Sequence, residues 1–187
     1  MNYIVSGIER SGTSMMMQIL HMGGAKVAFD KSRAPDQHNP KGYYELEGGK
    51  IINRLMDGSF PFEKYEGMFV KITAYGLKFL PEGQYRIIYM MRDLDEVMYS
   101  MEKMSGPIDR ENEKPVFEKL NSISIKLMEE RDDIDYIIMN YRDVIKNPVE
   151  EIEKLNGFLG GMLNVESAVG AVDPNLYRNI KKQGVKK

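Results

Sequence analysis

Gly7 and Gly12 are separated by four residues and stand between a short apolar run and an apolar helical pattern. The run Tyr3–Ser6 has the character of a buried strand, and Ser14–Met22 is predicted to be a helix. A glycine-rich turn between a strand and a helix is typical of a phosphate-binding P-loop, because backbone N–H groups and the helix N-terminus hold an anion there. This spacing therefore predicts an α/β domain with a phosphate site at the start of its first helix.

Short apolar runs alternate with amphipathic stretches along the rest of the chain, a pattern typical of βαβ units. The strands predicted from these runs are Tyr3–Ser6, Lys26–Phe29, Met68–Ile72, Tyr85–Met90 and Tyr136–Asn140. We therefore predict an α/β, P-loop-type three-layer fold, in which a central, mostly parallel five-stranded sheet is flanked by helices.

Two further helices and two long loops are predicted. A helix from about Pro115 to Arg131 follows from apolar residues that recur at steps of four, three and four. The residues of that apolar face are Val116, Leu120, Ile123 and Leu127. Another helix is predicted over about Val149–Leu159. The stretches Asp30–Gly42 and Ser105–Lys114 are predicted to be loops, and loops of this length often serve as lids or substrate loops.

The composition narrows the partners and surroundings of the chain. Its 187 residues suit one compact domain, which we expect to span residues 1–187. The formal net charge of −2 argues against nucleic-acid or membrane-surface binding, because both need a basic excess. The absence of cysteine excludes disulfides, thiolate metal sites and a cysteine nucleophile. The sequence shows neither a signal-peptide pattern nor an apolar run of ~20 residues, so we expect a cytoplasmic protein.

The cation of the loop distinguishes it from an ATP-binding P-loop. Thr13 stands where a P-loop kinase has lysine, and Arg10 supplies the positive charge two residues before Gly12. A kinase that lacks this lysine loses its contact with the β- and γ-phosphates. The segment Gly7-Ile8-Glu9-Arg10-Ser11-Gly12-Thr13-Ser14 resembles the 5′-phosphosulfate loop of the sulfotransferase superfamily.

This resemblance implies a sulfotransferase that uses 3′-phosphoadenosine 5′-phosphosulfate (PAPS) as its co-substrate and needs no metal. The loop amides and hydroxyls would hold the 5′-phosphate, and the loop cation would contact the bridging oxygen of the leaving group. The residues that take these roles by resemblance are Arg10, Ser11, Gly12, Thr13 and Ser14.

A second motif follows the predicted strand Tyr85–Met90. Arg92 stands at the strand end and Ser100 eight residues later, which resembles the 3′-phosphate motif of the same family. An arginine can grip a phosphate bidentately, and a serine hydroxyl adds a hydrogen bond. The family usually has proline after Arg-Asp, where this chain has leucine. Asp93 can start the following helix instead, as an N-cap with Glu96 three residues later.

Three weaker similarities extend the resemblance over most of the chain. The segment Asn39-Pro40-Lys41-Gly42-Tyr43-Tyr44-Glu45 resembles one found in bacterial-type small sulfotransferases. Lys71, after Phe69-Val70, resembles the catalytic lysine of several family branches. The stretch that begins Asn140-Tyr141-Arg142-Asp143 resembles one whose tyrosine packs near the adenine, which implies that role for Tyr141. Arg178, near the C-terminus, could contribute to the 3′-phosphate site.

The catalytic base is left open between two residues. Thr73 stands where the cytosolic branch of the family has a histidine base. Glu45 is the better candidate, because glycan-type branches use a glutamate in this region. His38, in the predicted loop, is the other. His21 is expected to pack or to lie on the surface of the first helix.

Two alternative functions remain at this stage. One is a P-loop nucleotide or small-metabolite kinase, and the other is a non-catalytic nucleotide-binding module that has lost its base. As partners we expect a sulfate-acceptor small molecule or glycan, and neither nucleic acid nor a membrane. The acceptor itself and the oligomeric state are left open by the sequence.

Overall fold

The structure, a computed structural model, describes residues 1–36, 39 and 42–174. Its centre is a parallel sheet in which the strands lie in the order β2-β1-β3-β4. The strands are β1 (Asn2–Gly7), β2 (Phe69–Lys71), β3 (Tyr85–Met91) and β4 (Ile134–Asn140). In the register of the sheet Val5 lies beside both Lys71 and Ile88, so the carboxyl ends of three strands meet at one edge.

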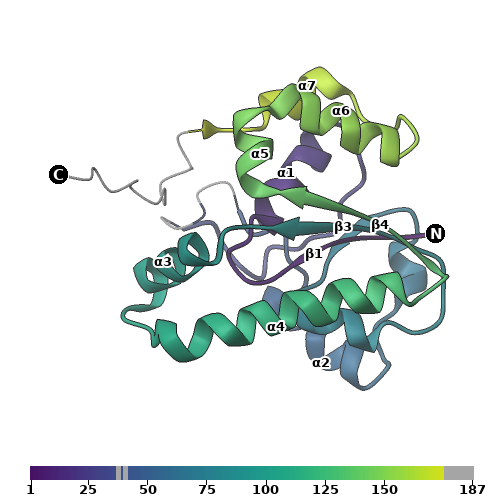
Figure 1. Cartoon of the computed structure of the whole chain (residues 1–187). Helices are drawn as coiled ribbons and strands as arrows, with labels where there is room; N and C mark the ends of the chain where they lie inside the picture. The colour runs from purple at the N-terminus through teal and green to yellow at the C-terminus, as the bar shows by residue number, and fades with distance from the viewer. Residues whose placement is uncertain (37–38, 40–41, 175–187) are drawn as a thin grey trace.

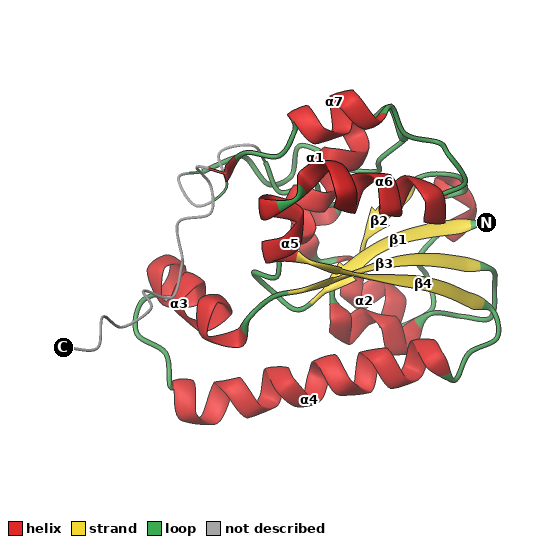
Figure 2. Ribbon diagram, turned by 45° about the horizontal axis from the view of Figure 1, so that its top comes forward, coloured by secondary structure: helices red, strands yellow, loops and turns green. Residues whose placement is uncertain are grey.

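Helices cover both faces of the sheet, which confirms the predicted three-layer α/β architecture (Figures 1 and 2). One face carries α1 (Thr13–Met22), α5 (Tyr141–Lys146), α6 (Pro148–Phe158) and α7 (Val165–Gly170). The other carries α2 (Ile51–Met56) and α4 (Arg110–Glu129), and α3 (Leu94–Ser105) lies beyond the end of β3. Three short 3-10 helices are η1 (Glu47–Gly49), η2 (Phe62–Tyr65) and η3 (Ala74–Phe79).

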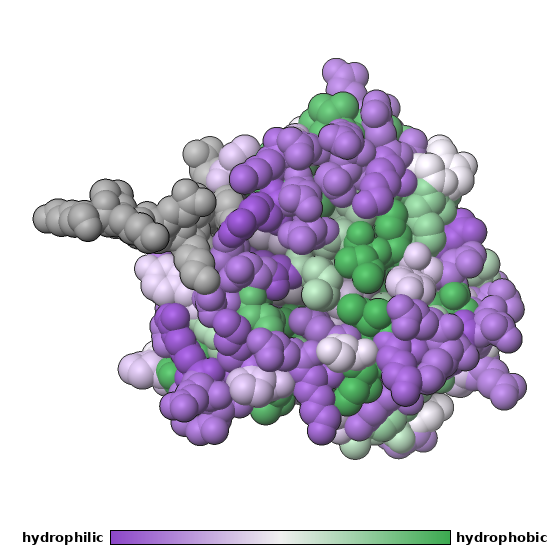
Figure 3. All heavy atoms as spheres, in the orientation of Figure 1, coloured by the Kyte–Doolittle hydropathy of each residue, from purple (hydrophilic) through white to green (hydrophobic). Residues whose placement is uncertain are grey.

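Alternation along the strands creates two hydrophobic cores, one under each helical layer. In β1, Ile4 belongs to the core beneath α2 and α4, while Val5 belongs to the core beneath α1 and α6. Successive side chains of a strand point to opposite faces, so each strand contributes to both cores. Figure 3 shows mostly hydrophilic side chains over the helices and hydrophobic ones gathered between the two helical layers. Ile138, on the edge strand β4, is 37% exposed.

The predicted count of five strands is wrong, because Lys26–Phe29 does not extend along the sheet within the described residues. Only Val27 forms a bridge, opposite Phe69. The chain then leaves the sheet edge: the side chain of Phe29 is 46% exposed, and the Asp30 carboxylate accepts the backbone N–H of Glu47 at 2.7 Å. A four-residue apolar run does not reveal whether the segment pairs along its whole length or, as here, at a single residue.

The long helix α4 begins earlier than predicted, and its buried face includes Leu120 and Leu127 of the predicted apolar face but is centred on Asn121, Ser124 and Met128. Asp109 caps it by accepting the backbone N–H of Asn112, so the predicted loop Ser105–Lys114 shrinks to residues 106–109. Two residues of the predicted apolar face, Val116 and Ile123, are 60% and 48% exposed.

The buried face of α4 is partly polar, and its polar groups have partners. The Tyr89 hydroxyl donates to Asn121 Oδ1 at 2.8 Å, and Ser124 Oγ donates to the carbonyl of Ala74 at 3.4 Å. Buried polar groups are stable where they are hydrogen-bonded, which a pattern of apolar residues cannot reveal. The predicted helices Ser14–Met22 and Val149–Leu159 are confirmed as α1 and α6. None of the described helices is long and apolar enough to cross a lipid bilayer.

Candidate active site

A cavity of about 740 Å³ opens at the carboxyl ends of β1, β2 and β3. The loop between β1 and α1 forms one wall, and the ends of β2 and β3 supply Lys71 and Arg92. Tyr141, at the start of α5, completes this part of the lining. In open parallel sheets ligands bind at this edge, so the cavity lies where the fold favours a site.

The glycines of the β1–α1 loop are required by its geometry. Gly12 has φ 105°, and a Cβ at this position would lie 2.4 Å from Tyr141 Cδ2. Gly7 has φ 146°, and its Cβ would lie 2.5 Å from Ser11 Oγ and 2.6 Å from the carbonyl of Met90. An L-residue is strained in the left-handed region and would collide here with fixed neighbours. Arg10 also has a positive φ, 63°, so the loop holds its cation in an uncommon backbone conformation.

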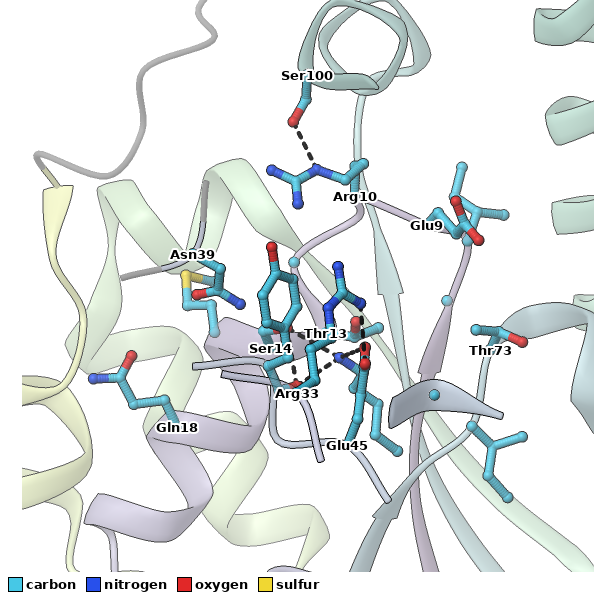
Figure 4. Close-up of a pocket in the computed structure, with 18 of the residues that line it drawn as sticks. Glu9, Arg10, Thr13, Ser14, Gln18, Arg33, Asn39, Glu45, Thr73 and Ser100 are labelled. Atoms are coloured by element: carbon cyan, nitrogen blue, oxygen red, sulfur yellow. Dashed lines mark hydrogen bonds and ion pairs between the residues drawn. The ribbon is translucent and has the colours of Figure 1, made fainter. Parts of the chain in front are cut away.

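The structure brings together the two motifs that the sequence keeps about 80 to 90 residues apart. Arg10 Nε donates to Ser100 Oγ at 2.9 Å, and Arg92 Nη1 donates to the carbonyl of Arg10 at 3.1 Å. The guanidinium of Arg92 lies over the ring of Tyr141, 4.2 Å from its centroid. Four of the predicted cofactor-binding residues therefore form one contiguous wall, and Figure 4 shows Arg10 and Ser100 side by side.

Arg92 is held in place by a buried carboxylate that the sequence analysis did not assign to the site. Glu96 accepts Arg92 Nε at 3.2 Å and Arg142 Nη2 at 2.7 Å, and its side chain is 1% exposed. Asp93 caps α3 as predicted, accepting the backbone N–H groups of Asp95 and Glu96. Glu96, in the first turn of α3, thus fixes the orientation of the Arg92 guanidinium.

Lys71 reaches the loop from the end of β2 and is saturated with acceptors. Its Nζ donates to the carbonyl of Tyr43 at 2.7 Å, pairs with Glu45 Oε1 at 2.8 Å and donates to Ser14 Oγ at 3.0 Å. Burial lowers the pKa of Lys71, and the nearby Glu45 carboxylate opposes this shift. This ammonium adds positive charge near the start of α1, and it would have to release one of its three acceptors to hydrogen-bond an anion bound there.

Glu45 lies between two cations. Besides Lys71, it accepts Arg33 Nη1 at 3.0 Å, and the Arg33 guanidinium lies over the ring of Tyr43, 3.4 Å from its centroid. Figure 4 shows Arg33 and Glu45 facing each other within the cavity. Arg33 was missed by the sequence analysis. The sequence held only a weak signal for it: Arg33 is an arginine within the predicted loop Asp30–Gly42, and that loop is followed directly by two tyrosines.

The remaining predicted residues differ in their places. Thr13 and Ser14 line the cavity, as does Asn39. Ser11 does not line the cavity, because its side chain is fully buried. Among the described residues its Oγ has no hydrogen-bond partner. His21 is exposed on α1, with its ring 5.8 Å from that of Phe29. His38 and Arg178 lie outside the described residues.

Basic side chains outnumber acidic ones around the cavity. The basic residues among the described lining are Arg10, Arg33, Lys71, Arg92 and Lys103, and the acidic ones are Glu9, Glu45 and Asp173. Burial lowers the pKa of Arg10, and the nearby cations Arg92 and Arg33 lower it further. A concentration of positive charge in a protein of net charge −2 indicates a local anion site. Within residues 1–36, 39 and 42–174 there is no group of three or more metal-ligating side chains.

The family model described as "Sulfotransferase domain" matches residues 2–187. The sulfotransferase domain of the Synechococcus PCC 7002 olefin synthase is 16% identical, with a TM-score of 0.54 over 100% of this chain and 90% of that one. The sulfotransferase domain from the curacin biosynthetic pathway is 14% identical, with a TM-score of 0.51 over 99% and 93%.

A sugar kinase from Janibacter sp. HTCC2649 is 15% identical and has a TM-score of 0.45, with 94% of this chain and 96% of that one covered. The search of curated proteins found no match. At these identities the two sulfotransferase domains establish a shared fold, which agrees with the predicted P-loop-type α/β class.

Proposed function

The chain belongs to the sulfotransferase domain family, and on that premise we propose that it moves a sulfuryl group from PAPS to a hydroxyl or amine acceptor. The observation that carries the proposal is the junction of the two phosphate motifs. Arg10 of the loop contacts Ser100, and Arg92 contacts the Arg10 carbonyl. One cavity wall thereby offers donors for two separate anionic groups, which is what a nucleotide with both 5′- and 3′-phosphates requires.

The proposed binding mode follows from these positions. The 5′-phosphosulfate would bind at the N-terminus of α1, against the backbone of Gly12 and the side chains of Thr13 and Ser14. The 3′-phosphate would bind at Arg92 and Ser100, and Tyr141 would pack near the adenine. Ser11 enters this proposal through its backbone, since its hydroxyl is buried below the loop.

The reaction we propose breaks one bond and forms one. The acceptor oxygen or nitrogen attacks the sulfur, the bond from sulfur to the bridging oxygen of the 5′-phosphate breaks, and 3′,5′-bisphosphoadenosine leaves with the electron pair. Charge develops on that bridging oxygen, where Lys71 would stabilise it, and Arg10 would do so once its guanidinium turns from Ser100 toward the 5′-phosphosulfate. The acceptor's proton would pass to Glu45, whose carboxylate lies beside the Lys71 ammonium.

His38 remains the alternative base. A single base is enough to accept the acceptor's proton, and substituting Glu45 and His38 one at a time identifies which of them it is.

The experiment that tests this proposal is single-turnover transfer from labelled PAPS at saturating donor. Arg10→Ala should lower the transfer rate about 10²-fold, the usual cost of losing one preorganised donor. Lys71→Ala should act in the same direction, and Glu45→Gln should slow transfer while leaving donor binding unchanged. Wild-type rates in all three variants would contradict the mechanism. A wild-type rate for Glu45→Gln together with an inactive His38→Ala would assign the base to His38.

A further inference from the structure

Arg33 is a cation of the cavity lining that has no role in the binding mode proposed above. Its Nη1 donates to Glu45 Oε2 at 3.0 Å, and its guanidinium lies over the ring of Tyr43, 3.4 Å from the centroid. Glu45 pairs with Lys71 through its other oxygen at 2.8 Å, and Lys71 also donates to the carbonyl of Tyr43 at 2.7 Å. Glu45 and Tyr43 thus each connect Arg33 to Lys71, and they hold the two cations on the same part of the cavity wall.

This pair of cations lies at the 5′ end of the proposed donor. Lys71 Nζ donates to Ser14 Oγ at 3.0 Å, which joins the pair to the first turn of α1. Figure 4 shows Ser100 above Arg10, and both Arg33 and Ser14 below it. A donor with its 3′-phosphate at Ser100 and its 5′-phosphate at Ser14 carries the sulfuryl group at the end of its 5′ chain. That group extends away from the ribose, and therefore toward Arg33 and Lys71.

Of these two cations, Arg33 has donors left for a ligand. The side chain of Lys71 is 8% exposed, and its three N–H groups are matched by three acceptors. The side chain of Arg33 is 39% exposed, and its contacts with Glu45 and Tyr43 occupy only part of the five N–H groups of a guanidinium. Burial lowers the pKa of Lys71, and the positive charges of Arg33 and Arg10 lower it further, so an anion placed here relieves repulsion between cations.

From this arrangement we infer that Arg33 binds the sulfuryl oxygens of PAPS and distinguishes this donor from the product, 3′,5′-bisphosphoadenosine. The inference rests on the proposed function, because it assigns a residue to the transferring group of that donor. The Nε–Nη2 edge of a guanidinium can donate to two oxygens of one oxyanion. Because this edge is separate from Nη1, Arg33 can hold the sulfuryl group and Glu45 together, which places the proposed base beside the sulfur that the acceptor attacks.

Calorimetry with the two nucleotides tests this inference without any acceptor. PAPS and 3′,5′-bisphosphoadenosine differ only in the sulfuryl group, so the ratio of their affinities reports on the contacts of that group. Arg33→Ala should weaken PAPS binding roughly tenfold to 150-fold, the usual cost of losing a hydrogen bond to a charged group. It should leave the binding of 3′,5′-bisphosphoadenosine unchanged.

Three variants serve as controls. Arg33→Lys keeps the charge but loses the two-donor edge, so it should recover part of the PAPS affinity. Glu45→Gln breaks the same ion pair but leaves the guanidinium in place, so it should keep the preference for PAPS. Arg54→Ala is the matched surface control: Arg54 pairs with Glu47 at 2.8 Å, its side chain is 38% exposed, and it is not among the described residues that line the cavity. It should change neither affinity.

The outcomes separate this inference from the function on which it rests. An equal loss for both nucleotides in Arg33→Ala, or no loss for either, overturns the sulfuryl contact and leaves the proposed donor intact. Loss of the PAPS preference in Glu45→Gln to the same extent assigns the effect to the ion pair, which also overturns the contact. Failure of the wild-type protein to bind either nucleotide overturns the proposed function, and the role of Arg33 with it.

Discussion

Replacing Arg92 with alanine should separate the contributions of the two phosphates of the proposed donor. The side chain of Arg92 is 7% exposed, and it contacts the Arg10 carbonyl on one side and Glu96 on the other. A hydrogen bond to a charged group contributes about 1.5–3 kcal/mol, so loss of the 3′-phosphate contact should weaken binding roughly tenfold to 150-fold. Loss of the donor to the Arg10 carbonyl should cost a further 0.5–1.5 kcal/mol or so, whichever nucleotide is bound.

Calorimetry with two nucleotides distinguishes these costs. 3′,5′-bisphosphoadenosine and adenosine 5′-monophosphate differ only in the 3′-phosphate, so the loss common to both reports on the loop and the difference reports on the 3′-phosphate. Arg142→Ala is the matched control, because Arg142 also pairs with Glu96 but is not among the residues that line the cavity. It should weaken both nucleotides slightly and equally. An equal loss for both nucleotides in Arg92→Ala would show that Arg92 is structural and refute its assignment to the 3′-phosphate.

Two further predictions concern the loop and the pH dependence of stability. Gly12→Ala should destabilise the protein by about 2–5 kcal/mol in chemical denaturation and abolish tight nucleotide binding, because it adds left-handed strain to a collision with Tyr141. The control is Gly58→Ala, at φ 71° with open space around it, which should cost only the backbone strain. Equal losses of stability in the two variants would contradict the collision. Arg131 Nε donates to Asp133 Oδ1 at 2.8 Å, and this guanidinium lowers the pKa of Asp133 from 3.8 to about 2. The resulting stability is present above pH 3.8 and lost as the pH falls to about 2, so Asp133→Asn should cost about 1 kcal/mol at pH 7, allowing for screening by water, and almost nothing at pH 2. A difference in unfolding free energy that is the same at both pH values would contradict this assignment.

The phosphate end of the site could be predicted from sequence because its chemistry is local. The loop needs glycines at two fixed positions, a cation and hydroxyls within eight residues, and all of these can be recognised without knowledge of the fold. The pair Arg92 and Ser100 is likewise carried by a single strand end and one helix. That Arg10 meets Ser100 could not be derived from spacing, since it depends on how β3 and α3 are placed beside β1.

The features that sequence missed depend on partners far along the chain or on irregular backbone. Asn121 is buried in α4 only because the Tyr89 hydroxyl reaches it from β3. Arg33 finds Glu45 across a loop in which Tyr44 and Glu47 adopt positive φ values of 51° and 52°. No periodicity marks such a loop, so its contribution to the cavity became visible only in three dimensions.

The most direct test of the central claim is nucleotide binding with and without metal, measured by calorimetry and thermal denaturation. We predict that 3′,5′-bisphosphoadenosine binds in the presence of a chelator and raises the melting temperature by mass action, while ATP with Mg²⁺ binds more weakly. Absence of 3′,5′-bisphosphoadenosine binding at millimolar concentration, together with tight binding of ATP and Mg²⁺, would contradict the sulfotransferase account and favour a kinase.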